Sequence, residues 1–418
     1  MKKLFFSTIF LIYLISVIPA SYAEGYLIEI DNEYNGINFL IFNFILLFVV
    51  LLFLQRKILL NFRDKIKKIF SFDLSKKHTI LILSVIFSIY IIFSFNELFE
   101  PEDGIDSQNV VPLAENFEIN EFPLQYFLRF FLLNLSIEIF DNIKIIPFLA
   151  SNFLILFTYL ITTEITKNRF GGIISVIAVL QSSLFLKYDT IAVYTNFWVL
   201  FYFISIYFTL KQWYVTPISF ACSLLTKHLS ALLIPASIFF VLRSEISRNR
   251  KIILSSYFVL LIIGGSVLAI VGNLESNIHP FSYKEFLSGF RIFAQSFQND
   301  LFIVLTILPL SVGLWWVSLR GNVYAESIQI LIASILLSGP IVTSISMFAN
   351  HDYRFMPLVI VFAIGLGTLF SKRKQVIKSN KIISTGVFGF TFIVILMNMI
   401  TVVFPTLIPG VNILNLFG

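Results

Sequence analysis

Long apolar runs, separated by short polar segments, repeat along the whole chain. Most of them approach the roughly 20 residues that an α-helix needs to cross a bilayer. They lie at about 4–20, 37–55, 79–95, 145–163, 170–187, 194–211, 214–226, 228–243, 252–271, 301–319, 326–348, 355–370 and 382–405. The pattern predicts an all-α, polytopic membrane protein with about 12–13 transmembrane helices.

The composition supports a membrane chain rather than a soluble one. Hydrophobic residues make up 57% of the 418 positions and charged residues only 13%, against about 25% charged in a typical soluble domain. A soluble fold of this size needs a charged shell that the chain does not supply. The single cysteine, Cys222, excludes an intrachain disulfide framework.

The first 23 residues allow two interpretations. Lys2 and Lys3, an apolar stretch and the small-residue pattern Ser21-Tyr22-Ala23 are typical of a signal peptide, and an uncleaved first transmembrane helix looks the same. The remaining parts that we expect are an extra N-terminal helix with a basic cytoplasmic loop at 24–78, a transmembrane core at 79–370 with an acidic outer loop at 96–144, and a basic cytoplasmic loop with a C-terminal transmembrane helix at 371–418.

Positive charges divide the loops between the apolar runs into two groups. If the runs cross the bilayer in alternation, one side receives 23 of the 30 basic residues and 5 of the 24 acidic ones. Short cytoplasmic loops retain Lys and Arg, so we expect this side in the cytoplasm of a multi-pass plasma-membrane protein. The formal charge of +6 then requires no nucleic-acid partner, because these residues fix topology and meet anionic lipid headgroups.

The opposite, extracytoplasmic side carries one long acidic loop. Eight of the 24 acidic residues fall between Glu97 and Glu121, without a single Lys or Arg among them. Most carboxylates in such a loop are simply solvated, but a carboxylate can also accept a proton from an attacking hydroxyl group. We therefore expect one or two of these acids to act in catalysis.

Cations interrupt the apolar pattern at two positions on the same side. Thr226-Lys227-His228 separates two short apolar segments, so this pair is predicted to form a hairpin with Lys227 at its apex. A lysine at such a break either binds an anionic partner or reaches the interface as an anchor.

The second cationic position is the turn His351-Asp352-Tyr353-Arg354. Its Arg354 offers a planar fork of donors for a phosphate group, or pairs with Asp352. Lys187, which is followed by Tyr188 and Asp189, also sits at a predicted outer helix end. Carboxylates and cations on one side suit sugar transfer from a lipid phosphate, in which a base activates the acceptor and cations stabilise the leaving phosphate.

Three motifs, in this order, resemble those of integral-membrane glycosyltransferases of the GT-C fold, the broad group of protein O-mannosyltransferases and the lipid A aminoarabinose transferase. "DSQNVVPLA" is similar to the acidic motif after the first core helix, with Asp106, Ser107, Val110 and Ala114 at its defined positions, and "EFPLQYFLRFFLLNLSIEIFDN" to the amphipathic stretch that follows. "FACSLLTKHLSALLIPA" resembles the segment that ends in Thr-Lys. "HDYRFMP" resembles a late His-x-Arg-Tyr-x-x-Pro element, with the Tyr and Arg in swapped order.

The resemblance implies inverting transfer from a polyprenyl-phosphate-linked sugar to an extracytoplasmic acceptor, at a site in the lipid bilayer. It implies Asp106 as the base, but Ser107 and Val110 replace the family's second acid and tyrosine, so Asp103 and Glu97 stay open as substitutes. The residues expected to bind the donor phosphate are Lys227, His228, Arg354, His351 and Lys187. No cofactor is expected, and a divalent metal in the acidic loop is a minority alternative.

A carrier without catalysis, such as a lipid-linked sugar flippase, is the competing interpretation. Transporters usually carry ionisable residues near the bilayer midplane and an internal repeat. Here the polar residues collect at one face and no inverted repeat stands out. The sequence therefore favours the enzyme.

Overall fold

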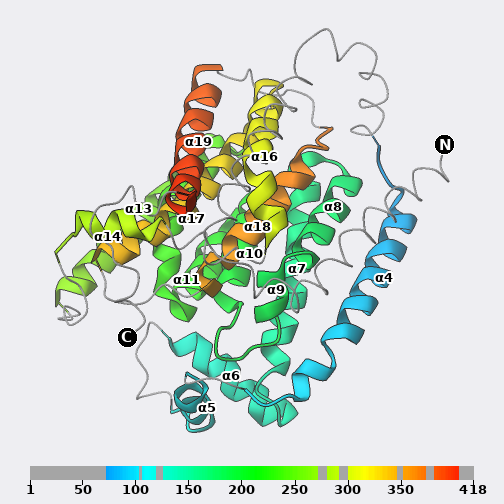
Figure 1. Ribbon diagram of the computed structural model, residues 1–418, viewed down its shortest axis with the longest axis vertical. Helices are drawn as coiled ribbons and strands as arrows, with labels where there is room; N and C mark the ends of the chain where they lie inside the picture. The colour runs from blue at the N-terminus through cyan, green and yellow to red at the C-terminus, as the bar shows by residue number, and fades with distance from the viewer. Residues whose placement is uncertain are drawn as a thin grey trace.

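A computed structural model of the chain describes residues 72–102, 106–118, 126–271, 280–290, 300–345, 352–372 and 381–403. Every regular element in these ranges is a helix (Figure 1). The prediction of an all-α chain is confirmed for this part of the sequence. The apolar runs predicted at 4–20 and 37–55 lie outside the described residues, as do the signal-peptide or first-helix segment 1–23 and residues 24–71 of the next part.

The helices follow the predicted apolar runs closely. The first half of the chain contains α4 (Lys76–Ser94), η1 (Asn96–Phe99), α5 (Ser107–Glu115), α6 (Phe127–Phe140), α7 (Ile145–Thr166), α8 (Arg169–Leu180), α9 (Ser183–Tyr188) and α10 (Phe197–Lys211). The second half contains η2 (Trp213–Val215), α11 (Thr216–Thr226), η3 (His228–Leu233), α12 (Ile234–Arg243), α13 (Arg248–Val271), α14 (Tyr283–Gly289), α16 (Leu301–Leu319), α17 (Val323–Ile345), η5 (Asp352–Phe355), α18 (Met356–Thr368) and α19 (Lys381–Val403).

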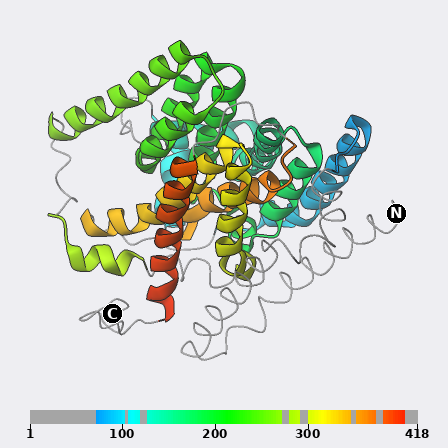
Figure 2. The same cartoon turned by 90° about the horizontal axis from the view of Figure 1, so that it is seen from above.

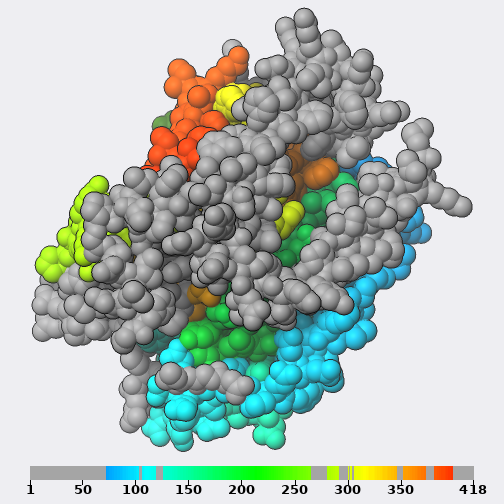
Figure 3. Space-filling model, viewed as in Figure 1, coloured from blue at the N-terminus to red at the C-terminus, as the bar shows by residue number. Residues whose placement is uncertain are grey.

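Four of the described helical stretches are long and apolar enough to cross a membrane, judged by length and composition: Lys76–Phe99, Ile145–Thr166, Val323–Ile345 and Lys381–Asn398. On α4, large apolar side chains such as Leu81, Ile92 and Phe93 point outward, with 63%, 70% and 77% of their surface exposed. In Figure 3, α4, in blue, lies along the lower right edge of the visible face, and the α5–α6 segment, in cyan, lies at the bottom. Figure 2 shows α4 and the long helix α13 on opposite sides of the molecule.

One predicted run, 170–187, is divided into two helices instead of forming a single one. Helix α8 ends at Leu180, and Ser182 caps α9 by accepting a hydrogen bond from the backbone N–H of Phe185 at 3.2 Å. The Ser182 hydroxyl group also donates to Asp300 Oδ2 at 2.6 Å, at the start of α16. The break coincides with the polar Gln181-Ser182-Ser183 inside the run, but the contact with Asp300 that fixes it joins residues distant in sequence.

Several turns that carry basic residues meet at one end of the helix assembly, which we call the basic end (residues 72–76, 164–169, 211, 243–245, 320–326 and 370–372). Here the Asn168 side-chain amide donates to the carbonyl groups of Phe72 at 3.0 Å and Phe370 at 2.7 Å. Arg243 and Glu326 form an ion pair at 2.5 Å. Successive long helices start and end there in turn, so the chain passes back and forth between two ends.

Two glycines allow a close crossing of α8 and α18 near the basic end. A Cβ atom on Gly367 would lie 2.5 Å from the carbonyl oxygen of Gly171, and a Cβ atom on Gly171 would lie 2.7 Å from the carbonyl oxygen of Gly367. Both distances are too short for a real Cβ atom, which stays at least about 3.0 Å from other heavy atoms. The opposing atoms belong to the backbone, so they cannot move aside as the end of a side chain could. This contact fixes the position of α18, whose other end carries η5.

Candidate functional site

The acidic motif lies at the end opposite the basic end, which we call the site end (Glu97, Asp106, residues 189–196, Lys227 and residues 352–354). In Figure 1, α5 and α6 lie at the bottom of the molecule. The motif positions Ser107, Val110 and Ala114 are all buried, and their spacing places them on one face of α5. This face packs on α6, where Asn134 donates to the Ala114 carbonyl oxygen at 3.1 Å.

Asp106 precedes α5 but does not cap it with its side chain. Aspartate at this position commonly accepts a hydrogen bond from the backbone of the first helical turn. The Asp106 carboxylate instead accepts one from the hydroxyl group of Tyr194, which belongs to the loop between α9 and α10. Burial raises the pKa of Tyr194, and the hydrogen bond and charge of Asp106 raise it further, so the phenol stays protonated and donates. Asp106 itself is exposed to solvent.

Three tyrosine rings connect this carboxylate to the η5 turn. Tyr194 stacks on Tyr353 with ring centroids 4.4 Å apart and planes at 27°. Tyr188 places its ring against both, at 5.7 Å from Tyr194 and 6.1 Å from Tyr353. The acidic motif and the "HDYRFMP" segment therefore meet through aromatic contacts.

Lys227 forms the apex of the predicted hairpin. Its backbone is extended between α11 and η3, and neighbouring hydroxyl groups satisfy the interrupted backbone. Ser230 donates to the Lys227 carbonyl oxygen at 3.0 Å, Thr226 donates to the Ser223 carbonyl oxygen at 2.8 Å, and Ser223 donates to the Trp198 carbonyl oxygen at 2.6 Å. This network holds the lysine at a defined place.

The Lys227 ammonium group faces aromatic rings. Its Nζ lies 3.6 Å from the ring centroid of Tyr353 and 5.8 Å from that of Trp198. Within the described ranges, no carboxylate forms a salt bridge with it. Burial lowers the pKa of Lys227 well below its ordinary value, and the positive charges of Arg129 and Arg354 lower it further. An anion bound beside these three cations would favour the charged form of Lys227 and so oppose both effects.

Arg129 is a third cation at this place, and it comes from α6. One of its guanidinium nitrogen atoms donates to the carbonyl oxygen of Val193, next to Tyr194. Its Nε atom is buried and has no hydrogen-bond partner among the described residues. Arg129, Lys227 and Arg354 thus concentrate positive charge around the tyrosine rings.

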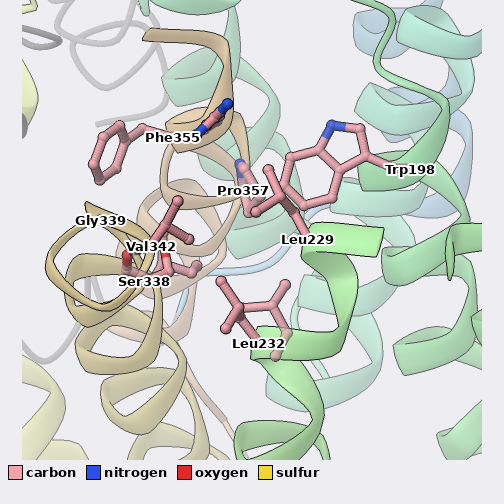
Figure 4. A pocket seen from close by; sticks show the side chains of 11 residues that line it. Trp198, Leu229, Leu232, Ser338, Gly339, Val342, Phe355 and Pro357 are labelled. Carbon is pink, nitrogen blue, oxygen red and sulfur yellow. Dashed lines mark hydrogen bonds between the residues drawn. The ribbon is translucent and has the colours of Figure 1, made fainter. Parts of the chain in front are cut away.

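A small, largely apolar cavity adjoins Arg354. Figure 4 shows Trp198, Leu229 and Leu232 on one side and Val342 and Phe355 on the other. Arg354 also lines this cavity. The arrangement places a charged group and an aromatic ring at the edge of an apolar space.

Glu97 lies in another part of the site end. Its side chain is exposed and accepts a hydrogen bond from Thr190 at 3.2 Å, while its backbone carbonyl accepts one from Lys144 Nζ at 3.0 Å. Lys144 is buried and forms an ion pair with Glu102 at 3.9 Å. Glu102 in turn accepts a hydrogen bond from the backbone N–H of Ala192 at 2.6 Å. These contacts attach the start of the acidic loop to the loop that carries Tyr194.

Asp189 is a buried carboxyl group between α4 and α9. Its Oδ2 accepts hydrogen bonds from Tyr90 at 2.7 Å and Ser94 at 3.3 Å, and only 1% of the residue is exposed. Burial raises its pKa to about 7. Since it has no access to solvent, Asp189 positions α4 rather than contacting a substrate.

The other predicted phosphate ligands are less central in the structure. Lys187 is exposed and pairs with Asp352 at 3.5 Å, so Asp352 has a partner other than the Arg354 that the sequence suggested. His228 is exposed, with its ring 6.1 Å from that of Tyr126. Asp103 and His351 lie outside the described residues.

The part of the chain that the structure describes contains no group of three or more His, Cys, Asp or Glu side chains able to hold a metal ion. The centre of the described site consists of the exposed Asp106 carboxylate, three cations and a set of aromatic rings.

Sequence reasoning missed Arg129 and Tyr194. A charge inside the apolar stretch "FLRFF" is a signal that could have drawn attention to Arg129, because an ionisable residue in such a segment is usually functional. Tyr194 lies in a loop without a motif, and its contact with Asp106 joins residues that are 88 positions apart. Comparison with protein-family models, with curated proteins and with solved structures finds no match to this chain.

Proposed function

We propose that this protein is a polytopic membrane glycosyltransferase of the GT-C type. It transfers a sugar, with inversion, from a polyprenyl-phosphate donor to a hydroxyl group of an acceptor on the extracytoplasmic side of the plasma membrane. The observation that carries the proposal is the meeting of three distant segments at one end of the molecule. Asp106, through Tyr194 and Tyr353, is connected to Lys227.

The two kinds of group suit the two halves of the transfer. The Asp106 carboxylate accepts the proton of the acceptor hydroxyl group while the acceptor oxygen forms a bond to the anomeric carbon. The bond between that carbon and the phosphate oxygen breaks, and its electron pair leaves with the polyprenyl phosphate. Attack from the face opposite the leaving group inverts the anomeric centre.

Cations stabilise the negative charge on the departing phosphate. Lys227 and Arg354 fill this role in the proposal, and Arg129 supports them from α6, because its charge lies close enough to lower the pKa of Lys227. The apolar side chains beside Arg354 and Trp198 offer a contact surface for the first carbon atoms of the donor's lipid next to the phosphate.

The test is transfer by the purified protein in lipid vesicles that contain acceptor from native membranes. A panel of polyprenyl-phosphate sugars is supplied, and release of polyprenyl phosphate is measured. The wild type is expected to release it from one donor. Asp106→Asn keeps the shape of the side chain but removes its basicity, and it should lower the rate at least about a hundredfold with donor binding retained.

Matched variants separate the possible outcomes. Normal transfer by Asp106→Asn combined with loss in Glu97→Gln or Asp103→Asn would assign the base to another acid of the loop. Donor binding without release of polyprenyl phosphate from any donor would contradict the enzyme and favour the carrier.

Cysteine labelling tests the orientation. In a Cys222→Ala background, a cysteine at exposed Gln108 should react with an impermeant reagent outside intact cells, whereas one at exposed Lys167 should not. The reverse labelling pattern would place the site in the cytoplasm and contradict the extracytoplasmic reaction.

A further inference from the structure

Tyr353 lies between the two halves of the proposed site. Tyr194 stacks on its ring at 4.4 Å, and the Lys227 Nζ lies 3.6 Å from its centroid. A ring and an ammonium group cannot share one ring face at these distances, so they occupy opposite faces. Tyr353 therefore separates the Lys227 ammonium group from the phenol that holds Asp106.

The contact between Lys227 and Tyr353 is a cation–π interaction in place of an ion pair. Such a contact is weaker than a charge-assisted hydrogen bond between an ammonium group and a phosphate oxygen. Arg129 and Arg354, whose charges act on Lys227, make the position still more favourable for an anion. A phosphate group that reaches Lys227 should therefore replace the ring as its partner.

We propose that Tyr353 is a positioning residue that holds Lys227 in the ligand-free protein and gives it up when a lipid phosphate binds. When Lys227 leaves the ring of Tyr353, the stack of Tyr353 on Tyr194 loosens as well. The hydrogen bond between Tyr194 and Asp106 then weakens. Donor binding then makes the carboxylate available for the acceptor. This inference rests on the proposed function for the identity of the donor, and it adds an order of events to it.

The direct test is binding of farnesyl phosphate, an isoprenoid monophosphate, to the full-length protein in detergent by titration calorimetry. Tyr353→Ala removes the competing ring and should bind about twofold to thirtyfold more tightly than the wild type. Tyr353→Phe keeps the ring and should bind within about twofold of the wild type. Tyr353→Leu, which fills the space without an aromatic face, should behave like Tyr353→Ala and serves if the smaller residue impairs folding.

A double-mutant cycle with Lys227→Ala distinguishes this competition from a structural effect. In the Lys227→Ala background, Tyr353→Ala should no longer change the affinity, because the ring then has no ammonium group to hold. Tyr214→Ala is the matched control, since this tyrosine is exposed in η2 and lies outside the site end. Weaker binding by both Tyr353→Ala and Tyr353→Phe would overturn the inference and make the phenol a direct phosphate ligand.

Two further ligands identify the source of the phosphate. Inorganic phosphate should bind more weakly than farnesyl phosphate, and farnesol should not respond to substitution of Lys227. Equal binding of inorganic and farnesyl phosphate would overturn the lipid part of the inference.

The transfer assay is independent of this series. The predicted binding pattern without any sugar transfer would leave the role of Tyr353 standing and contradict the enzyme. Sugar transfer with unchanged binding in Tyr353→Ala and Tyr353→Leu would support the enzyme and contradict the role of Tyr353.

Discussion

The cations beside the tyrosine rings of the site end differ in their partners from the paired cations of the basic end. At the basic end, Arg243 pairs with the buried Glu326, Lys372 pairs with Asp73 at 3.5 Å, and Lys211 pairs with Glu164 at 2.7 Å. At the site end, Lys227 lies on the ring of Tyr353, and Arg129 donates to a backbone carbonyl group. The paired cations connect helices, whereas Lys227 and Arg129 are the cations that we propose to receive an anion from outside.

The buried pair at the basic end should give the largest effect on stability. Glu326→Gln leaves the Arg243 charge without its counter-ion in a site where Glu326 has 0% of its side chain exposed. The free energy of unfolding should fall by about 3–5 kcal/mol, as measured by denaturation in detergent. Glu164→Gln, at the same end but partly exposed, should cost only about 0–1 kcal/mol. Equal effects of the two substitutions would mean that burial does not distinguish these pairs.

Substitution of Arg129 tests whether the cations of the site end, and not those of the basic end, bind the phosphate. Arg129→Met keeps a flexible, unbranched side chain but removes the guanidinium group and its charge, so affinity for farnesyl phosphate should fall about tenfold to a hundredfold. Arg169→Met removes a cation at the basic end and should leave this affinity unchanged. A loss of similar size in both variants would show that the net charge of the protein, and not the site end, governs binding.

The pH dependence of binding should report the state of Lys227. Its pKa is lowered by burial and by Arg129 and Arg354, so raising the pH removes its proton below the ordinary lysine value of about 10.4. Between about pH 8 and 10, where the charge of a phosphate monoester is constant, affinity for farnesyl phosphate should decline. Lys227→Arg should abolish this decline, because arginine stays protonated. If the affinity of the wild type for farnesyl phosphate did not change with pH, the phosphate would bind at a place other than Lys227.

The smallest effect is expected for the surface pair at the site end. Lys187 and Asp352 are 58% and 36% exposed and 3.5 Å apart, so Lys187→Ala should change the free energy of unfolding by about 0–1 kcal/mol. Donor affinity should change less than in Arg129→Met. A larger loss of affinity would move Lys187 into the group of phosphate ligands.

Helix positions could be predicted from the sequence wherever an apolar run decides them. The hairpin apex at Lys227 could also be predicted from the sequence, because a charge interrupts apolar segments there. The division between α8 and α9 was not, since it depends on a contact between Ser182 and Asp300, which are 118 positions apart.

The candidate site divides in the same way. Asp106, Lys227 and Arg354 were named from motifs and charge, but their connection through tyrosine rings depends on contacts between distant segments. Asp189 and Glu97 are both acidic residues at ends of apolar runs in the sequence, and only the fold shows that the first is buried and the second exposed. Charge in a sequence indicates which residues are unusual, and the tertiary contacts decide what each of them does.

The glycine crossing of α8 and α18 extends the reach of mutations far beyond the site. Helix α18 has 13 residues and is therefore about 20 Å long. A side chain at Gly367 would have to push α18 away from the backbone of α8, and because a helix is stiff, the displacement would be carried to Tyr353 and Arg354 at its other end. A random search for inactive variants should therefore recover substitutions at Gly171 and Gly367 alongside those at the site end.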